Sequence, residues 1–201
     1  MFTICDAIVD CQFPFPRMRC GARTRVFCHL PSSWTDFHKL IDTRCGLGGI
    51  SHGASAIGLH TTVANDMNPR MVELHAAHST CEHVVGDIGD LHVVADIWVK
   101  CDRAAVLAAG FSCQPFSSLG DHLGGADPRA STLPKVLPAV YLLQVKVIML
   151  ECVVPAKSDL CVNQMLEKFM ALTGFTMEVV TLDLQNAWPC RHCWSWWLLI
   201  H

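Results

Sequence analysis

The strongest constraint on the fold is a regular alternation that begins at Lys39. Short apolar segments typical of β-strands alternate with segments that carry helix start and stop signals. The residues between 145 and 150 form a continuous apolar run, as expected for a strand covered on both faces. The alternation therefore predicts an α/β fold with a mostly parallel sheet flanked by helices. The expected strands are 39–42, 61–64, 84–85, 104–108, 145–150, 175–182 and 194–200, and the expected helices are 50–57, 68–78, 131–143 and 160–172.

Composition narrows the class of protein. The chain has 201 residues, 51% of them apolar and 16% charged, which excludes a disordered or polyelectrolyte chain and allows one domain with a core. The formal net charge of -3 gives no overall signal for nucleic acid, although a cleft can concentrate basic groups. No apolar run is long enough for a bilayer, so we expect no membrane association. No signal peptide is recognisable, and we expect an intracellular protein, nuclear if the source is eukaryotic.

The chain contains 12 cysteines at irregular spacings. For an intracellular protein this pattern favours reduced thiols over a disulfide framework. Only Cys190 and Cys193 have the spacing of a metal-binding pair, and one pair cannot complete a four-ligand zinc site. The expectation is therefore no metal.

Residues 1–36 do not follow the strand-helix alternation. They contain Phe-Pro repeats and a short arginine cluster that could touch phosphate, but a solvated irregular tail is the favoured interpretation. We expect two regions, an irregular tail over 1–36 and a catalytic domain over 37–201.

Three loops that follow expected strands suggest a ligand site, because ligands of such sheets bind outside the carboxyl ends of the strands. Glycines in Asp42-Thr-Arg-Cys-Gly-Leu-Gly-Gly49 let the backbone approach a ligand, although such a loop is as often a tight turn. Asp66 can accept from ribose hydroxyls or serve as a helix-start carboxylate, and Met67 can lie against an adenine ring. Asp87 can accept from an adenine amino group or belong to an ordinary turn.

A fourth loop contains a candidate nucleophile. Cys113 follows an expected strand and is flanked by Gly, Ser and Pro, which exposes a thiol. Glu151 follows the apolar strand 145–150, so it is expected at the same edge of the sheet. A nucleophile and an acid at one edge form a recognisable catalytic pattern.

Together these motifs resemble those of a known family. Gly110-Phe-Ser-Cys113-Gln-Pro-Phe-Ser117 is similar to the Gly-Phe-Pro-Cys-Gln-Pro-Phe-Ser signature of cytosine-C5 DNA methyltransferases. Cys45-Gly-Leu-Gly-Gly-Ile-Ser-His-Gly53 looks like the cofactor loop of that family. Asn65-Asp66, Gly86-Asp-Ile88, Asp127-Pro-Arg129 and Glu151-Cys-Val153 follow in the family's order, so the resemblance covers about residues 39–200.

The resemblance implies a class I S-adenosylmethionine-dependent methyltransferase fold, a Rossmann-like sheet flanked by helices, that methylates carbon 5 of cytosine in DNA. In this family a thiolate adds to carbon 6 of a cytosine that has been flipped from the duplex. Cys113 corresponds to that thiolate, and Glu151 steadies N3 and the amino group. Arg191 stands where an arginine contacts the ring, and Gln114 and Ser117 are expected to bind substrate. The implied S-adenosylmethionine-binding residues are Asp42, Cys45, Gly46, Leu47, Gly48, Gly49, Asp66, Met67, Asp87 and Ile88.

The sequence departs from the family at several positions. Arg44 replaces an aromatic residue, Ser112 a proline and Cys152 an asparagine, and the late Gln-x-Arg-x-Arg motif is degraded at 189–193. Family members continue into a target-recognition region and a C-terminal helix, for which this sequence has no counterpart.

These departures leave two alternatives open. One is a catalytically impaired fragment, or half of a split enzyme that needs a complementary chain. The other is a methyltransferase that acts on cytosine in tRNA. The Trp-rich segment 194–200 is expected to hold core residues rather than a base-stacking platform, and to form an unpaired apolar strand that invites association.

Overall fold

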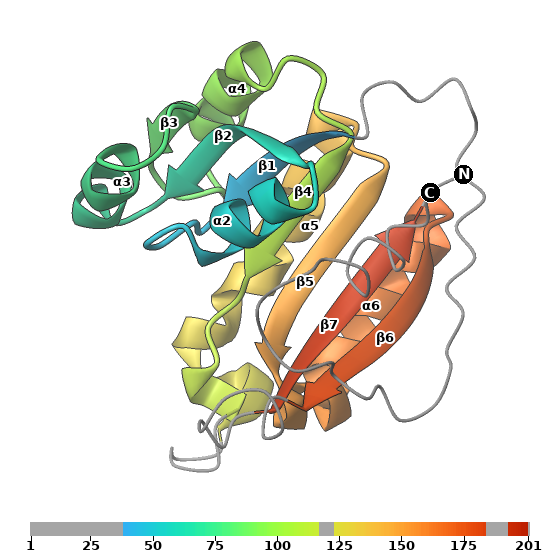
Figure 1. Ribbon diagram of the computed structural model, residues 1–201. Helices are drawn as coiled ribbons and strands as arrows, with labels where there is room; N and C mark the ends of the chain where they lie inside the picture. Colours follow the sequence, from blue (N-terminus) through green and yellow to red (C-terminus); the bar gives the residue numbers. More distant parts are fainter. Residues whose placement is uncertain (1–37, 117–122, 184–192, 201) are drawn as a thin grey trace.

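The computed structural model describes residues 38–116, 123–183 and 193–200, which form an α/β unit built on one sheet (Figure 1). The strands are β1 Lys39–Thr43, β2 His60–Asp66, β3 Glu82–Val85, β4 Val106–Gly110, β5 Val147–Val153, β6 Thr176–Asp183 and β7 Cys193–Ile200. The helices are α2 Gly49–Ala56, α3 Pro69–Ala76, α4 Leu91–Lys100, α5 Thr132–Leu143 and α6 Leu160–Thr173. Short 3-10 turns occur at Gln114–Phe116, Gly124–Ala126, Pro128–Ser131 and Val154–Ser158.

The strands form a seven-stranded sheet in the order β3-β2-β1-β4-β5-β7-β6. The pairings from β3 through β5 are all parallel, and β7 pairs antiparallel with both β5 and β6. The prediction of a mostly parallel sheet is confirmed. Because β1 to β5 run in one direction, the loops after these strands meet at one edge of the sheet.

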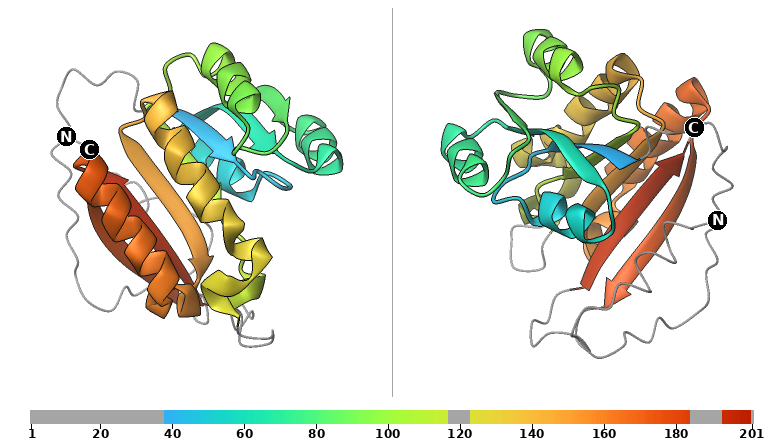
Figure 2. Two further views of the ribbon diagram at one scale, coloured as in Figure 1. Left: turned by 180° about the vertical axis from the view of Figure 1, so that it is seen from behind. Right: turned by 45° about the horizontal axis from the view of Figure 1, so that its top comes forward.

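Helices cover both faces of the sheet. In Figures 1 and 2, α4, α5 and α6 lie against one face and α2 lies against the other. Alternate residues of β4 divide between two hydrophobic clusters accordingly: Leu107 and Ala109 join the larger, which includes residues of α4, α5 and α6. Val106 and Ala108 join the smaller, which includes Ala54 of α2. Burial on both faces explains why the central strands are nearly continuous apolar runs.

The local helix signals act as the sequence predicts. The Asn68 side chain accepts a hydrogen bond from the backbone N–H of Arg70, and Pro69 occupies the first turn of α3. Gly174 ends α6 in the left-handed conformation (φ 76°). Among the residues that the structure describes, no helix combines the length and apolar character that a bilayer span requires.

Three expectations need correction. The Trp-rich strand β7 is not an unpaired edge, because it lies between β5 and β6 and is hydrogen-bonded to both. Helix α4 was not expected; its start signal is only Asp90, whose side chain makes no capping hydrogen bond. Strand β5 continues to Val153, so Glu151 lies within the strand rather than after it. The strand reaches further because antiparallel pairing with β7 extends along its full length.

Candidate active site

The glycine-rich loop after β1 is fastened to the end of β2. Asp66 accepts hydrogen bonds from the backbone N–H groups of Gly46 (3.1 Å) and Asn68 (2.9 Å), one at each carboxylate oxygen. The N–H of Cys45 donates to the carbonyl of Asn65 (2.9 Å). Asp66 thus shapes the loop, and each of its oxygens keeps a second lone pair for a ligand hydroxyl.

Asp42 lies beneath this loop and is fully buried. Its Oδ2 accepts from the backbone N–H (3.1 Å) and the hydroxyl (2.6 Å) of Ser51, in the first turn of α2. Its Oδ1 is buried without a hydrogen-bond partner among the described residues. Burial raises the pKa of Asp42 to about 6. Asp42 therefore anchors the start of α2, and through it the end of the glycine loop.

A cleft of about 380 Å³ opens at the ends of the parallel strands. Several expected residues line it: Met67 after β2, Asp87 and Ile88 after β3, and Gln114 after β4. The other expected cofactor residues, Asp42, Cys45, Gly46, Leu47, Gly48, Gly49 and Asp66, belong to the loop and strand ends beside the cleft rather than to its lining. The remaining lining residues are Arg44, Asn65, Gly86, Ser112, Pro128, Arg129, Ser131, Thr132 and Lys135.

The cleft also contains cationic side chains that no sequence motif indicates. Lys135 of α5 forms an ion pair with Asp87, which also accepts from the N–H of Gly89 (3.0 Å). Its hydrogen bond to Lys135 is the main cause of a lowered pKa for Asp87. The guanidinium of Arg44 donates to the Thr132 hydroxyl. Nothing in the sequence spacing places α5 against these loops, so these contacts could not be predicted.

In the segment Asp127-Pro-Arg129, Pro128 and Arg129 line the cleft. Asp127 is buried, and it accepts from the backbone N–H of Arg129 (2.8 Å) and from its guanidinium. The guanidinium lowers the pKa of Asp127 to about 2. The same Arg129 donates to the side-chain oxygen of Gln114 (3.1 Å), the residue after Cys113. A rigid carboxylate-arginine pair thereby orients the residue next to the candidate nucleophile.

The register of β4 and β5 sets Glu151 beside the strand end from which the Cys113 loop departs. Gly110, the last residue of β4, pairs with Glu151. A Cβ atom on Gly110 would lie 3.2 Å from Oε2 of Glu151, so the glycine leaves room for that side chain. Phe111 donates its N–H to the carbonyl of Glu151 (3.2 Å). Cys113, half-buried, follows in the turn that its own carbonyl closes with the N–H of Phe116 (3.0 Å).

Glu151 is the least satisfied acid of this edge. Its Oε1 is buried and has no hydrogen-bond partner among the described residues. Burial raises the pKa of Glu151 to about 7. A buried acid that is protonated near neutral pH, beside a candidate nucleophile, can donate or accept a proton during a reaction.

Cys152 lies next to Glu151 but faces the protein interior. It is fully buried, and its Sγ is 3.6 Å from the carbonyl oxygen of Phe111 and 3.8 Å from that of Ser112. Burial raises the pKa of Cys152 to about 12, which keeps it a thiol. It supports the backbone that carries Cys113. Ser117 and Arg191, the other expected site residues, and the tail 1–36 lie outside the residues that the structure describes.

Sequence comparisons agree with this geometry. The family described as C-5 cytosine-specific DNA methylase matches residues 38–188. The chain is 34% identical over 94 residues to the type II methyltransferase M.HaeII of Haemophilus aegyptius, which covers 47% of this chain and 28% of that protein. It is 29% identical over 151 residues to M.NlaX of Neisseria lactamica, 74% of this chain and 43% of that one.

Solved structures show the same fold. A putative DNA modification methyltransferase encoded within an Escherichia coli prophage superposes with a TM-score of 0.65 at 18% identity, covering 81% of this chain and 46% of that one. The S. pombe Dnmt2 methyltransferase gives a TM-score of 0.60 at 17% identity, covering 81% and 49%. This chain spans less than half the length of each of these four proteins.

Proposed function

Because this chain belongs to the C-5 cytosine-specific DNA methylases, we propose that it transfers a methyl group from S-adenosylmethionine to carbon 5 of cytosine in DNA. The observation that carries the proposal is the pairing of Gly110 with Glu151. It sets a buried, unpartnered carboxyl group at the strand end from which the Cys113 loop departs.

The cleft beside the glycine loop fits the cofactor. Its volume lies within the range of roughly 300–1,000 Å³ that is usual for small-molecule sites. Met67, 56% exposed, and Ile88 offer apolar surface to an adenine ring, and Asp87 offers an acceptor to its amino group. Asp66, beside the cleft, is the acceptor proposed for the ribose hydroxyls. When bound, S-adenosylmethionine supplies an electrophilic methyl group on a sulfonium ion. The protein's part is to hold that group beside the nucleophile loop.

In this proposal Cys113 performs the covalent step. Its thiolate sulfur adds to carbon 6 of cytosine, and the electron pair of the 5,6 double bond becomes available at carbon 5. After carbon 5 has taken the methyl group, it loses its proton, the 5,6 double bond re-forms and the sulfur leaves as thiolate. Splitting one difficult substitution into addition and elimination is the advantage of a covalent nucleophile.

Glu151 assists the addition from the neighbouring strand. Protonated, its carboxyl group donates to N3 of cytosine, which becomes more basic as sulfur adds to carbon 6. Its other oxygen accepts from the exocyclic amino group. The pKa of about 7 keeps a substantial protonated fraction near neutral pH, so the acid matches this task.

DNA as the substrate follows from the family, and the target base must leave the duplex to reach Cys113. In this proposal residues 37–201 form the catalytic domain. Selection of the target sequence belongs to protein outside it, in the same polypeptide or in a complementary chain. Arg191 and Ser117 remain proposed contacts of the flipped base.

A covalent trap tests the proposal. The protein is incubated with S-adenosylmethionine and a duplex oligonucleotide that carries 5-fluorocytosine. The fluorine on carbon 5 cannot leave in the way that the proton of cytosine does, so the covalent adduct persists. We expect an adduct that is stable to denaturation and that peptide mapping places on Cys113. The Cys113→Ser variant should form no adduct. The matched control Cys161→Ser, which changes an exposed cysteine of α6, should form it normally.

The outcomes separate the alternatives. An adduct on another cysteine would contradict the assigned mechanism. An adduct formed with a tRNA transcript that carries 5-fluorocytosine, but not with DNA, would identify tRNA as the substrate. Cofactor binding by calorimetry without an adduct on either nucleic acid would favour the impaired-fragment alternative.

A further inference from the structure

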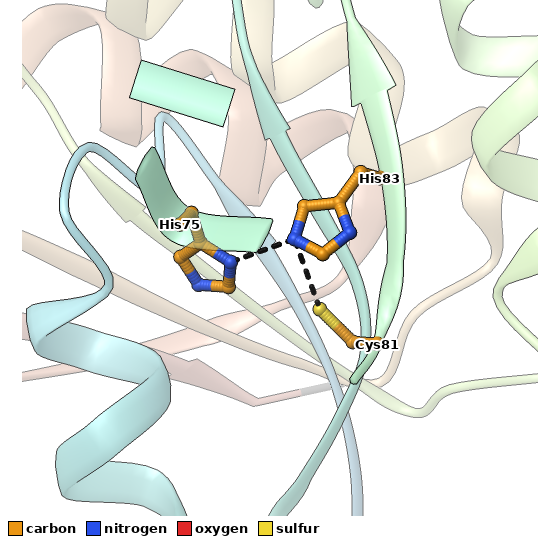
Figure 3. Close-up of side chains that lie close together, drawn as sticks. All are labelled: His75, Cys81 and His83. Carbon is orange, nitrogen blue, oxygen red and sulfur yellow. Dashed lines mark hydrogen bonds between the residues drawn. The ribbon is translucent and has the colours of Figure 1, made fainter. Parts of the chain in front are cut away.

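A second group of reactive side chains lies against the glycine loop and outside the lining of the cleft. His75 of α3, Cys81 immediately before β3 and His83 of β3 point toward one another (Figure 3). His75 Nδ1 is 2.8 Å from His83 Nε2, and Cys81 Sγ is 3.8 Å from the same nitrogen. The donor atoms of all three residues lie within 4.8 Å of one another.

We propose that His75, Cys81 and His83 bind a zinc ion that fastens α3 and β3 against the glycine loop. This inference does not depend on the proposed methyl transfer.

The distances suit a tetrahedral ion. Bonds of ~2.0–2.1 Å to nitrogen and ~2.3 Å to sulfur place two such donors roughly 3.3–3.6 Å apart. The separations of 2.8 and 3.8 Å bracket that range, and all three donor atoms lie within 4.8 Å of one another, so side-chain shifts of about 1 Å bring them to tetrahedral distances. Imidazole and thiolate donors select zinc over magnesium or calcium, which prefer oxygen.

A chain of hydrogen bonds behind His75 gives independent support. His75 Nε2 lies 3.2 Å from the Ser51 hydroxyl, which donates to Asp42 Oδ2 at 2.6 Å. With a proton on Nε2, His75 donates to Ser51, and its Nδ1 lone pair points at the cluster. Metal-binding histidines characteristically donate their other N–H to a partner of this kind, which fixes the tautomer and the ring orientation.

The surroundings determine the fourth position. His75 is fully buried, whereas Cys81 and His83 are half-buried, so an ion can reach them from solvent. The nearby His78 donates from Nε2 to the carbonyl oxygen of Leu47 (2.8 Å), and it is not part of the group whose donor atoms lie within 4.8 Å of one another. Within the described residues the protein thus supplies three ligands, and a water molecule completes the tetrahedron.

The site adjoins the proposed cofactor site. A Cβ atom on Gly48 would lie 2.7 Å from Cδ2 of His75, so loop and cluster are in direct contact. Through Ser51, His75 also connects to Asp42 beneath the loop. A bound ion would therefore hold α3, β3 and the glycine loop in one arrangement.

Cobalt substitution tests the proposal directly. The full chain, freed of metal by a chelator under reducing conditions, is titrated with Co²⁺. We expect one equivalent to produce the intense visible absorption of tetrahedral cobalt and a near-ultraviolet thiolate-to-cobalt charge-transfer band. Zinc should displace both signals and raise the Tm of the metal-free protein.

Variants assign the ligands. Cys81→Ser should abolish the charge-transfer band, and His83→Gln should abolish the tetrahedral spectrum. Cys161→Ser, which changes an exposed cysteine of α6, and Cys190→Ser, which breaks the CxxC pair, should leave both unchanged. Ser51→Ala, which removes the partner of His75, should weaken zinc binding by roughly 10- to 100-fold.

Clear results would overturn the site. One is a wild-type protein with native circular dichroism that shows no thiolate-to-cobalt band. Another is a band that survives in Cys81→Ser but is lost in Cys190→Ser, which would place the metal at the Cys190–Cys193 pair. Either result would leave a direct hydrogen bond between His75 and His83 as the reason for the cluster.

Discussion

The acids on the two sides of the candidate active site differ in their hydrogen-bond partners. On the side of β2 and β3, Asp66 accepts from two backbone N–H groups and Asp87 pairs with Lys135. On the side of β4 and β5, the Oε1 atom of Glu151 is buried without a partner within the described part of the chain. The pKa of Asp87 is lowered, mainly by Lys135, and that of Glu151 is raised to about 7 by burial.

This contrast separates positioning from chemistry. Hydrogen bonds to Asp66 fix the shape of a loop, and a shape is what a cofactor site needs before its ligand arrives. An acid that exchanges a proton with substrate must instead be left without a competing partner. A buried carboxyl oxygen without a hydrogen-bond partner costs stability, so the position of Glu151 on β5, beside the end of β4, supports the role proposed for it.

The largest effect is expected from a variant that impairs the catalytic half of the site alone. Glu151→Gln should slow methyl transfer, or formation of the trapped adduct, by roughly 10²–10⁴-fold, the usual loss for a positioned acid. Cofactor affinity should stay within experimental error, because Glu151 does not line the cleft. Single-turnover kinetics and calorimetry on one preparation measure both. A rate within about threefold of wild type would remove Glu151 from the mechanism.

The second largest effect is expected from a variant that weakens cofactor binding. Asp66→Ala removes the acceptor that holds Gly46, and we expect S-adenosylmethionine affinity to fall by roughly 10- to 100-fold, equivalent to one or two charge-assisted hydrogen bonds. Calorimetry measures the change. Glu167→Ala, which alters an exposed acid of α6, is the control and should bind normally. Equal affinity for Asp66→Ala and the control would mean that the acid serves only as a helix-start carboxylate.

The contrast also predicts how stability varies with pH. The pKa of Glu151 rises from 4.5 to about 7 on folding, so the native state holds its proton more tightly than the unfolded chain. Its contribution is fully present below pH 4.5 and is lost as pH rises to about 7. Asp42, raised from 3.8 to about 6, acts in the same direction at lower pH.

Glu151→Gln should therefore narrow the difference in Tm between pH 5 and pH 8, mainly by raising the Tm at pH 8. Thermal unfolding at the two pH values, with Glu167→Gln as the matched exposed control, measures this. A variant with the same pH dependence as wild type would show that Glu151 is better solvated than its burial indicates.

Much of this architecture could be predicted because each signal is local. The alternation of apolar strands with capped helices gives the sheet, and the Asn68-Pro69 cap marks the start of α3 to the residue. The Cys113 loop and Glu151 were assigned to one edge because parallel strands end together. The register of β4 with β5 supports that reasoning.

The remaining features depend on contacts between distant segments. The ion pair of Asp87 with Lys135 joins residues 48 positions apart, and no periodicity in either segment indicates it. The place of β7 between β5 and β6 was missed because an apolar terminal segment can be an edge or an interior strand. The His75–Cys81–His83 cluster lacks a familiar zinc spacing, since its ligands meet only when α3 packs beside β3.

The smallest expected effect concerns Lys135 and sharpens the comparison. Its ion pair with Asp87 is partly exposed, with 41% of the lysine side chain accessible, and such pairs contribute about 0–1 kcal/mol. Lys135→Gln frees one oxygen of Asp87 for the adenine amino group, so S-adenosylmethionine affinity should rise, by less than about fivefold on the same energy scale. Asp87→Asn should weaken binding in the same calorimetric assay, because it replaces an acceptor with a donor. A loss of tenfold or more in Lys135→Gln, well above the range for an exposed pair, would mean that the lysine itself contacts the cofactor. In that case the cofactor half too would contain a side chain held ready for its ligand, and the contrast of Glu151 with Asp66 and Asp87 would no longer separate chemistry from positioning.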